Sequence, residues 1–199
     1  MLIVSKLNKK LFYILFVLSL LMLGGVSFAN FFDKSNVLGS TFSVASSDIK
    51  LLQNNTLGTN QSNLIDYLDG PDFDNINPYW QKDYLIKIYN NGSANLDIIS
   101  NSDFLLTNDP KNISKILFVE IIEWNDANSN GVVDEQEGVY SFGKKSFEMW
   151  KAQGINIGTI NKQNLKGYIL RFTTQAISDD LQGATALFDF TFNSTPSSN

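Results

Sequence analysis

The sequence predicts an all-β protein, an antiparallel β-sandwich with short helical turns in its connecting loops. Several short segments alternate between apolar and polar residues, which is the period of a half-buried strand. The clearest is 186–193, in which Phe188, Phe190 and Phe192 share one face. The connections between these segments are rich in Asn and Gly, and helical periodicity is weak. Many short strands joined by such turns are typical of a β-sandwich.

The expected strands follow one another along the chain after residue 40. Residues 84–89 alternate, and the Asn/Gly turn at 90–93 predicts a hairpin whose second strand is 94–99. Residues 116–124 are apolar on both faces, as in a central strand. The remaining expected elements are a strand or strand pair at 41–52, a strand at 166–174, and helical turns at 62–68 and 144–152.

The composition excludes several kinds of chemistry. The chain has 199 residues with no cysteine and no histidine, so disulfides, thiol catalysis, His-based triads and His-ligated zinc are ruled out. Its formal net charge is −5. An acidic protein is repelled by phosphate backbones, so we expect no nucleic acid as a partner. No residue falls in a recognisable catalytic motif, and the protein is predicted not to be an enzyme.

The N-terminus has the three parts of a secretory signal. Residues 1–10 carry three lysines and no acid, and 11–23 form an apolar run that only one serine interrupts. Small residues at Ser27 and Ala29 then predict cleavage before Asn30. Loss of this segment would leave 12 basic and 20 acidic residues, a net charge of −8.

The alternative is a retained membrane anchor, because 11–29 contains 19 residues and is just long enough to cross a bilayer. Either way, the rest of the chain is expected outside the cytoplasm, with membrane contact only through an uncleaved signal. The expected organisation is a signal peptide at 1–29, an N-terminal segment and possible donor strand at 30–45, a β-sandwich at 46–194, and a polar tail at 195–199.

One loop carries recognisable site chemistry. Residues 126–137 match the calcium-loop pattern D-x-[DN]-x-[DN]-G-x5-E, with Gly131 at the sharp bend. Ca²⁺ takes six to eight oxygen ligands, which such a loop can supply from side chains and one backbone carbonyl. The predicted ligands are Asp126, Asn128, Asn130, the carbonyl of Val132, Asp134 (through water) and Glu137, which can bind with both oxygens. The alternative is a solvated Asn/Gly turn between strands.

Four motifs, in order, resemble the TasA/CalY/camelysin family of secreted bacterial and archaeal proteins. They are GGVSFANFFD at 24–33 with STFSV at 40–44 and DIKL at 48–51, IKIYNNGS at 86–93, the 126–137 loop, and QG at 182–183 followed by Phe188, Phe190 and Phe192. The resemblance implies a jelly-roll-like β-sandwich that is processed by a dedicated signal peptidase and exported. It also implies a subunit of extracellular fibres, in which an N-terminal strand of one subunit completes the sheet of the next.

These arguments together predict a secreted structural subunit of extracellular or biofilm-matrix fibres, with copies of itself as partners and Ca²⁺ as a cofactor. Strand addition needs apolar anchors near the new N-terminus. The candidates are Phe31, Phe32, Val37, Leu38 and Phe42. An ordinary first strand of the same domain remains the alternative for this segment. The rival functions are a monomeric, calcium-stabilised adhesion module and a secreted peptidase, since some family members are labelled metallopeptidases.

Overall fold

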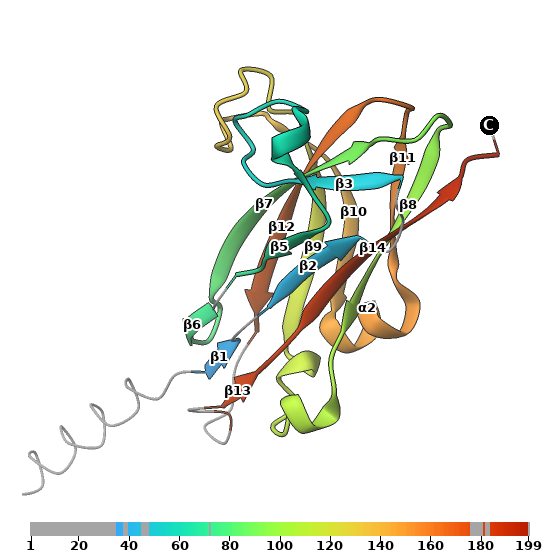
Figure 1. Ribbon diagram of the computed structural model, residues 1–199. Helices are drawn as coiled ribbons and strands as arrows, with labels where there is room; N and C mark the ends of the chain where they lie inside the picture. Colours follow the sequence, from blue (N-terminus) through green and yellow to red (C-terminus); the bar gives the residue numbers. More distant parts are fainter. Residues whose placement is uncertain are drawn as a thin grey trace, which may run out of the picture. The chain divides into compact units, whose positions relative to one another are not determined.

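The computed structural model describes the body formed by residues 34–199, apart from a few short gaps. Its placed residues are 35–37, 40–44, 48–71, 73–175, 181 and 184–198. Within these ranges no helix is long and apolar enough to cross a membrane. The body is an all-β sandwich with short helical turns in its loops, as the sequence predicts (Figure 1).

One layer of the sandwich is a six-stranded sheet in which every described pair is antiparallel. The sheet has the order β10-β9-β12-β7-β3-β4. Its strands are β10 (Gly138–Ser146), β9 (Leu117–Trp124), β12 (Leu165–Thr174), β7 (Gln81–Asn90), β3 (Ile49–Leu52) and β4 (Leu64–Ile65).

The other layer is a five-stranded sheet of order β11-β8-β14-β2-β5, in which only β14 and β2 pair in parallel. Its strands are β11 (Ile155–Ile160), β8 (Leu96–Asp103), β14 (Asp189–Pro196), β2 (Thr41–Val44) and β5 (Tyr67–Asp69). A small third sheet places β1 (Ser35–Val37) between β13 (Thr185–Ala186) and β6 (Phe73–Ile76).

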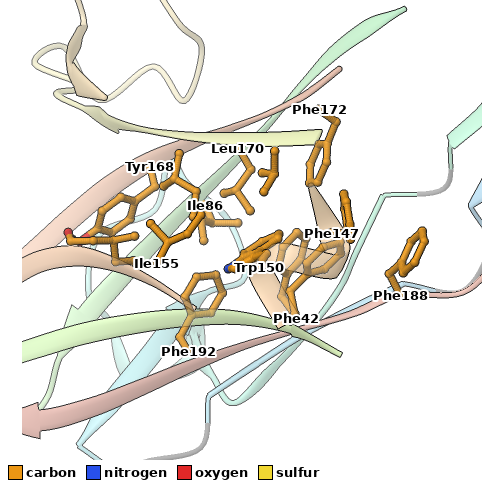
Figure 2. Close-up of a cluster of buried hydrophobic side chains, with 14 of the residues drawn as sticks. Phe42, Ile86, Phe147, Trp150, Ile155, Tyr168, Leu170, Phe172, Phe188 and Phe192 are labelled. Carbon is orange, nitrogen blue, oxygen red and sulfur yellow. The ribbon is translucent and has the colours of Figure 1, made fainter. Parts of the chain in front are cut away.

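The core lies between the two large sheets and is dominated by aromatic rings. Phe42, Phe190 and Phe192 from the five-stranded sheet meet Phe172 and Tyr168 from the six-stranded sheet, and all five side chains are fully buried. Figure 2 shows four of them, Phe42, Phe192, Phe172 and Tyr168, pointing into the space between the sheets. Because large buried side chains contribute the most hydrophobic stabilisation, these rings hold the two layers together.

One helix closes an end of this core. Helix α2 (Phe147–Gln153) begins at Ser146, whose hydroxyl accepts a hydrogen bond from the backbone N–H of Met149, the usual chemistry of an N-cap. The helix buries Phe147 and Trp150, and Trp150 Nε1 donates to the carbonyl of Ser100 at 2.8 Å. The helical turn predicted at 144–152 is therefore confirmed for 147–152, whereas 144–146 belong to the end of β10. The 3₁₀ turns are η1 (Gln61–Asn63), η2 (Leu106–Asn108) and η3 (Ile113–Lys115).

The predicted hairpin of 84–89 with 94–99 is wrong. Strand β7 is flanked by β12 and β3, whereas β8 pairs with β14 and β11 in the opposite sheet. Asn90 is fully buried at the crossing, where its Nδ2 donates to the carbonyls of Ala94 and Ile160. This side chain directs the chain into the other layer rather than back along β7.

Two shorter predictions also change. Residues 62–68 give only the end of η1, followed by β4 and the start of β5, so the helical expectation there is mostly wrong. Residues 41–52 do contain two strands, but β2 and β3 lie in different sheets and are not hydrogen-bonded neighbours. The N-terminal segment 30–45 thus contributes β2 to the sandwich itself, and β14 runs into the expected polar tail as far as Pro196.

Candidate functional site

The 126–137 loop joins two neighbouring strands of the six-stranded sheet, β9 and β10, and stands at one end of the sandwich (Figure 1). Its two ends are tied together, because the N–H of Asn125 donates to the carbonyl of Glu137 at 2.9 Å and Gly138 pairs with Trp124. The loop therefore projects from a fixed base.

The first half of the loop is folded by its own side chains. Asp126 accepts hydrogen bonds from the N–H of Asn130 at Oδ1 and from the N–H of Gly131 at Oδ2, both at 3.0 Å. Asn128 Oδ1 also accepts from the N–H of Asn130, and Asn130 Oδ1 accepts from the N–H of Val132. Such side-chain to backbone bonds define tight turns, and all three polar side chains take part in them.

The second half of the loop completes this arrangement. Asp134 Oδ2 accepts from Nδ2 of both Asn128 and Asn130, each at 2.8 Å. Glu137 Oε2 accepts from the N–H of Asp134 and from Trp124 Nε1, both at 3.0 Å. The structure thus links all the side chains predicted as ligands through one hydrogen-bonded network.

Gly131 occupies a position that requires glycine. Its φ is +73°, in the left-handed region that other residues rarely adopt. A Cβ built on it would lie 2.7 Å from Cγ2 of Thr56, in the loop that precedes η1. The bend is therefore packed against a neighbouring loop, which restricts the path of the 126–137 loop.

The side chains predicted as ligands differ in solvent exposure: two are buried and three are exposed. The Asp126 side chain is 1% exposed and Glu137 is 8% exposed, whereas Asn128, Asn130 and Asp134 are exposed. Val132, predicted only for its carbonyl oxygen, has a solvent-exposed side chain. The donor atoms are oxygens, which suits a hard cation such as Ca²⁺. Among the residues that the structure describes, no three carboxylates gather into a metal-binding group.

The main partner of this loop is Lys87 on β7, which the sequence motifs do not predict. Its ammonium Nζ lies 2.7 Å from Asp126 Oδ2 and 2.7 Å from the carbonyl oxygen of Asn55, and 5.0 Å from the centroid of the Trp124 ring. Lys87 interrupts the apolar pattern of its strand, but nothing in that pattern connects it with a loop 39 residues further along the chain.

The ion pair changes the acidity of Asp126. Burial acts to raise the pKa of its carboxyl group, but the hydrogen bond and charge of Lys87 and the backbone N–H groups of Gly131 and Asn130 outweigh it, so the pKa lies below its usual value. Because both partners are buried, removing either would cost roughly 3–5 kcal/mol. The pair therefore fastens the loop to the middle of the sheet.

The predicted donor-strand anchors fall partly inside the described structure. Phe42 lies in β2, is fully buried, and stacks on Phe190 with ring centroids 4.7 Å apart and on Tyr84 at 5.0 Å. Val37 ends β1, where its backbone pairs with Ala186 and Phe73. The other anchors and the expected cleavage site lie outside the described residues: Phe31, Phe32, Leu38, Ala29 and Asn30.

A comparison with known protein families and with curated proteins finds no match to this chain. The resemblance to the TasA/CalY/camelysin family therefore remains an interpretation of the sequence motifs.

Proposed function

We propose that this protein is an exported structural subunit of extracellular fibres, which assembles by strand addition and carries a calcium-binding loop at 126–137. It would be released by a signal peptidase that cuts before Asn30, and its partners would be copies of itself.

The observation that carries the proposal is the pairing of the N-terminal strands. In the described part of the chain, the only two parallel pairings join β1 to β13 and β2 to β14. Parallel neighbours cannot be the two arms of a tight hairpin, so each N-terminal strand is inserted beside a C-terminal strand rather than folded onto it locally. An inserted strand near a chain terminus is an element that identical copies can exchange.

The position of β2 in the five-stranded sheet provides what an exchanged strand needs, a buried side chain and backbone pairing on both edges. Phe42 fills a buried space against Phe190 and Tyr84, while the backbone of β2 pairs with β14 on one side and β5 on the other. Backbone pairing gives affinity and the buried ring fixes the register. The same segment of a neighbouring subunit would make identical contacts, so exchange would preserve the core of each subunit.

Calcium is the second part of the proposal. Asp126, Asn128, Asn130 and Asp134 are already linked on one side of the loop, and Glu137 lies at its base. Few charged ligands favour weak binding, of the kind found in extracellular modules with dissociation constants of about 10⁻⁴–10⁻³ M. The ion would stabilise the end of the sandwich without performing chemistry.

Engineered cysteines test the strand exchange directly, because the natural chain contains none. Ser43 on β2 pairs in register with Thr191 on β14. Neighbouring strands lie about 4.8 Å apart, within the roughly 4.4–6.8 Å between Cα atoms that a disulfide can span. In fibres of Ser43→Cys/Thr191→Cys, strand exchange predicts a ladder of covalent multimers on a non-reducing gel.

The matched control is Asp97→Cys/Thr159→Cys, which joins β8 to β11 within the body of the sandwich. That pair should give only crosslinked monomers in every preparation. A second test mixes the two single variants, Ser43→Cys and Thr191→Cys, whose cysteines can meet in the β2–β14 register only if β2 crosses between chains. The mixed dimer should therefore form in excess over dimers of either variant alone.

The burial of Phe42 in its own core specifically favours one rival, a monomeric adhesion module stabilised by calcium. In that case Ser43→Cys/Thr191→Cys would give intrachain crosslinks alone, and the mature protein would form no filaments by electron microscopy. This result would reject the fibre proposal and leave the calcium loop to be judged separately.

A further inference from the structure

Lys87 is a buried cation between the six-stranded sheet and the 126–137 loop. Its side chain is 7% exposed, and its ammonium group donates to Asp126 Oδ2 and to the carbonyl of Asn55. The Trp124 ring lies beside the same group. A buried ammonium with these three neighbours has a fixed position, unlike the mobile head of a surface lysine.

Its position coincides with the first predicted calcium ligand. Asp126 Oδ2 accepts from both Lys87 Nζ and the N–H of Gly131, so its acceptor capacity is used. Oδ1 accepts a single bond, from the N–H of Asn130. A calcium ion at this carboxylate would therefore compete with the ammonium for Oδ2, or bind Oδ1 close to another positive charge.

A second feature beside the loop is a buried oxygen of Asn55. Asn55 Oδ1 is buried and has no hydrogen-bond partner. The Cβ of the same residue lies 3.7 Å from the place that a Cβ on Gly131 would take. A buried oxygen without a donor is unusual in a folded protein and can be satisfied by a water, an ion or a donor group that reaches it. Asn55, whose backbone carbonyl accepts from Lys87, thus also carries a side-chain oxygen without a hydrogen-bond partner.

We propose that Lys87 sets the calcium affinity of the 126–137 loop, because its ammonium group is a built-in cation that holds Asp126 and that an incoming Ca²⁺ must either displace from Oδ2 or bind beside at Oδ1. This inference rests on the proposed calcium site. In low calcium the loop would stay folded, because the ammonium group balances the charge of Asp126. The loop would bind Ca²⁺ only when calcium is plentiful. Such behaviour suits a protein that folds during export and meets high calcium outside the cell.

The test is calorimetric titration of the mature protein with CaCl₂, with MgCl₂ as the competing ion. Lys87→Met keeps most of the aliphatic stem and removes the charge. Because calcium affinity in such loops follows the charge balance of the site, Lys87→Met should bind Ca²⁺ at least about tenfold more tightly than the natural protein. Lys87→Arg keeps the positive charge and should retain the weak affinity.

Lys50→Met is the matched control, because it makes the same change in net charge at a lysine that pairs with Asp66 rather than with the loop. It should leave the calcium affinity unchanged. Should Lys87→Met be unstable, calcium should restore its folding at concentrations that barely affect Lys50→Met, and failure of calcium to do so would reject the inference.

The outcomes separate the inference from the proposal beneath it. Equal calcium affinity in the natural protein and Lys87→Met would overturn the role of Lys87 and leave the calcium loop standing. Absence of binding in both proteins, with both folded, would reject the loop as a calcium site together with the inference. Neither result would bear on strand exchange, which the cysteine pairs test.

Discussion

Replacement of Phe42 by alanine measures whether β2 completes the core of the soluble subunit. The Phe42 side chain is fully buried, and three aromatic rings lie within 6.3 Å of its own, centroid to centroid: those of Tyr84, Phe190 and Phe192. Truncation of a buried Phe removes its transfer free energy and leaves a cavity, which together cost about 3–5 kcal/mol. For a chain of this size each kcal/mol lowers the Tm by roughly 2–4 °C, so Phe42→Ala should lose about 6–20 °C.

The assay is chemical denaturation of the mature monomer followed by circular dichroism, with thermal melting as a second measurement. Val44→Ala is the control in the same strand, because Val44 is only partly buried and its truncation leaves a smaller cavity. A loss below about 1 kcal/mol for Phe42→Ala would refute the reasoning, since a residue at the centre of the core cannot be removed so cheaply. It would mean that β2 lies outside its seat in the soluble monomer.

Three further predictions concern acid, processing and assembly. Because the pKa of Asp126 is lowered in the folded protein, its contribution to stability is present above the unfolded value of about 3.9 and is lost as the pH falls further. The free energy of unfolding, measured by denaturation at several pH values between pH 5 and pH 2, should therefore fall less steeply for Asp126→Asn than for the natural protein. Equal slopes in the two proteins would argue against this account. Mass spectrometry of the exported protein should find Asn30 as the first residue, and an intact Met1 would contradict cleavage. Deletion of residues 30–38 removes β1 but keeps β2, and it should leave a folded sandwich that forms no filaments in the electron microscope if β1 must be donated together with β2. Unchanged fibres would exclude donation of β1 and leave the exchange of β2 to the cysteine test.

The strands themselves could be predicted because their information is local. The alternation of Phe188, Phe190 and Phe192 is visible in any short window, and all three side chains are fully buried in the core. The apolar segment 116–124 became β9, which has a neighbour on each side as expected. Which strand pairs with which could not be predicted from such windows, because pairing is decided across the whole chain.

The failed hairpin illustrates this limit. An Asn/Gly turn after an alternating strand usually returns the chain to the same sheet. Here both edges of β7 are taken by strands distant in sequence, β3 and β12, and β8 instead joins β14 with Leu96, Ile98 and Ser100 directed into the core. The fully buried Asn90 marks the crossing, but a sequence shows only an Asn in a turn.

The candidate site likewise combines a local part, which the sequence predicts, with distant partners, which it does not. The 126–137 pattern is contiguous, so its internal network could be expected from the residue spacing. Lys87 and Asn55 reach the loop from other parts of the chain, and their effect depends on the packing of β7 beside β12 and β9. A single Lys in an apolar strand predicts a solvent-exposed position, whereas Lys87 is buried against the carboxylate of Asp126.

Glu137 provides the means to separate the two halves of the proposed function. The loop stands on the six-stranded sheet, whereas β2 lies in the five-stranded sheet, so the proposed calcium binding and the proposed strand exchange would act on different layers. In 10 mM calcium a site with a dissociation constant of about 10⁻⁴–10⁻³ M adds roughly 1.4–2.7 kcal/mol by mass action, or about 3–11 °C in Tm. Glu137→Gln retains an oxygen for Trp124 Nε1 and the N–H of Asp134, but loses the charge of a bidentate ligand. It should abolish most of the calcium-dependent rise in Tm while leaving the crosslinking pattern of Ser43→Cys/Thr191→Cys unchanged. If Glu137→Gln also removed the interchain ladder, calcium would be required for assembly itself, and the two layers would have to be treated as one cooperative unit.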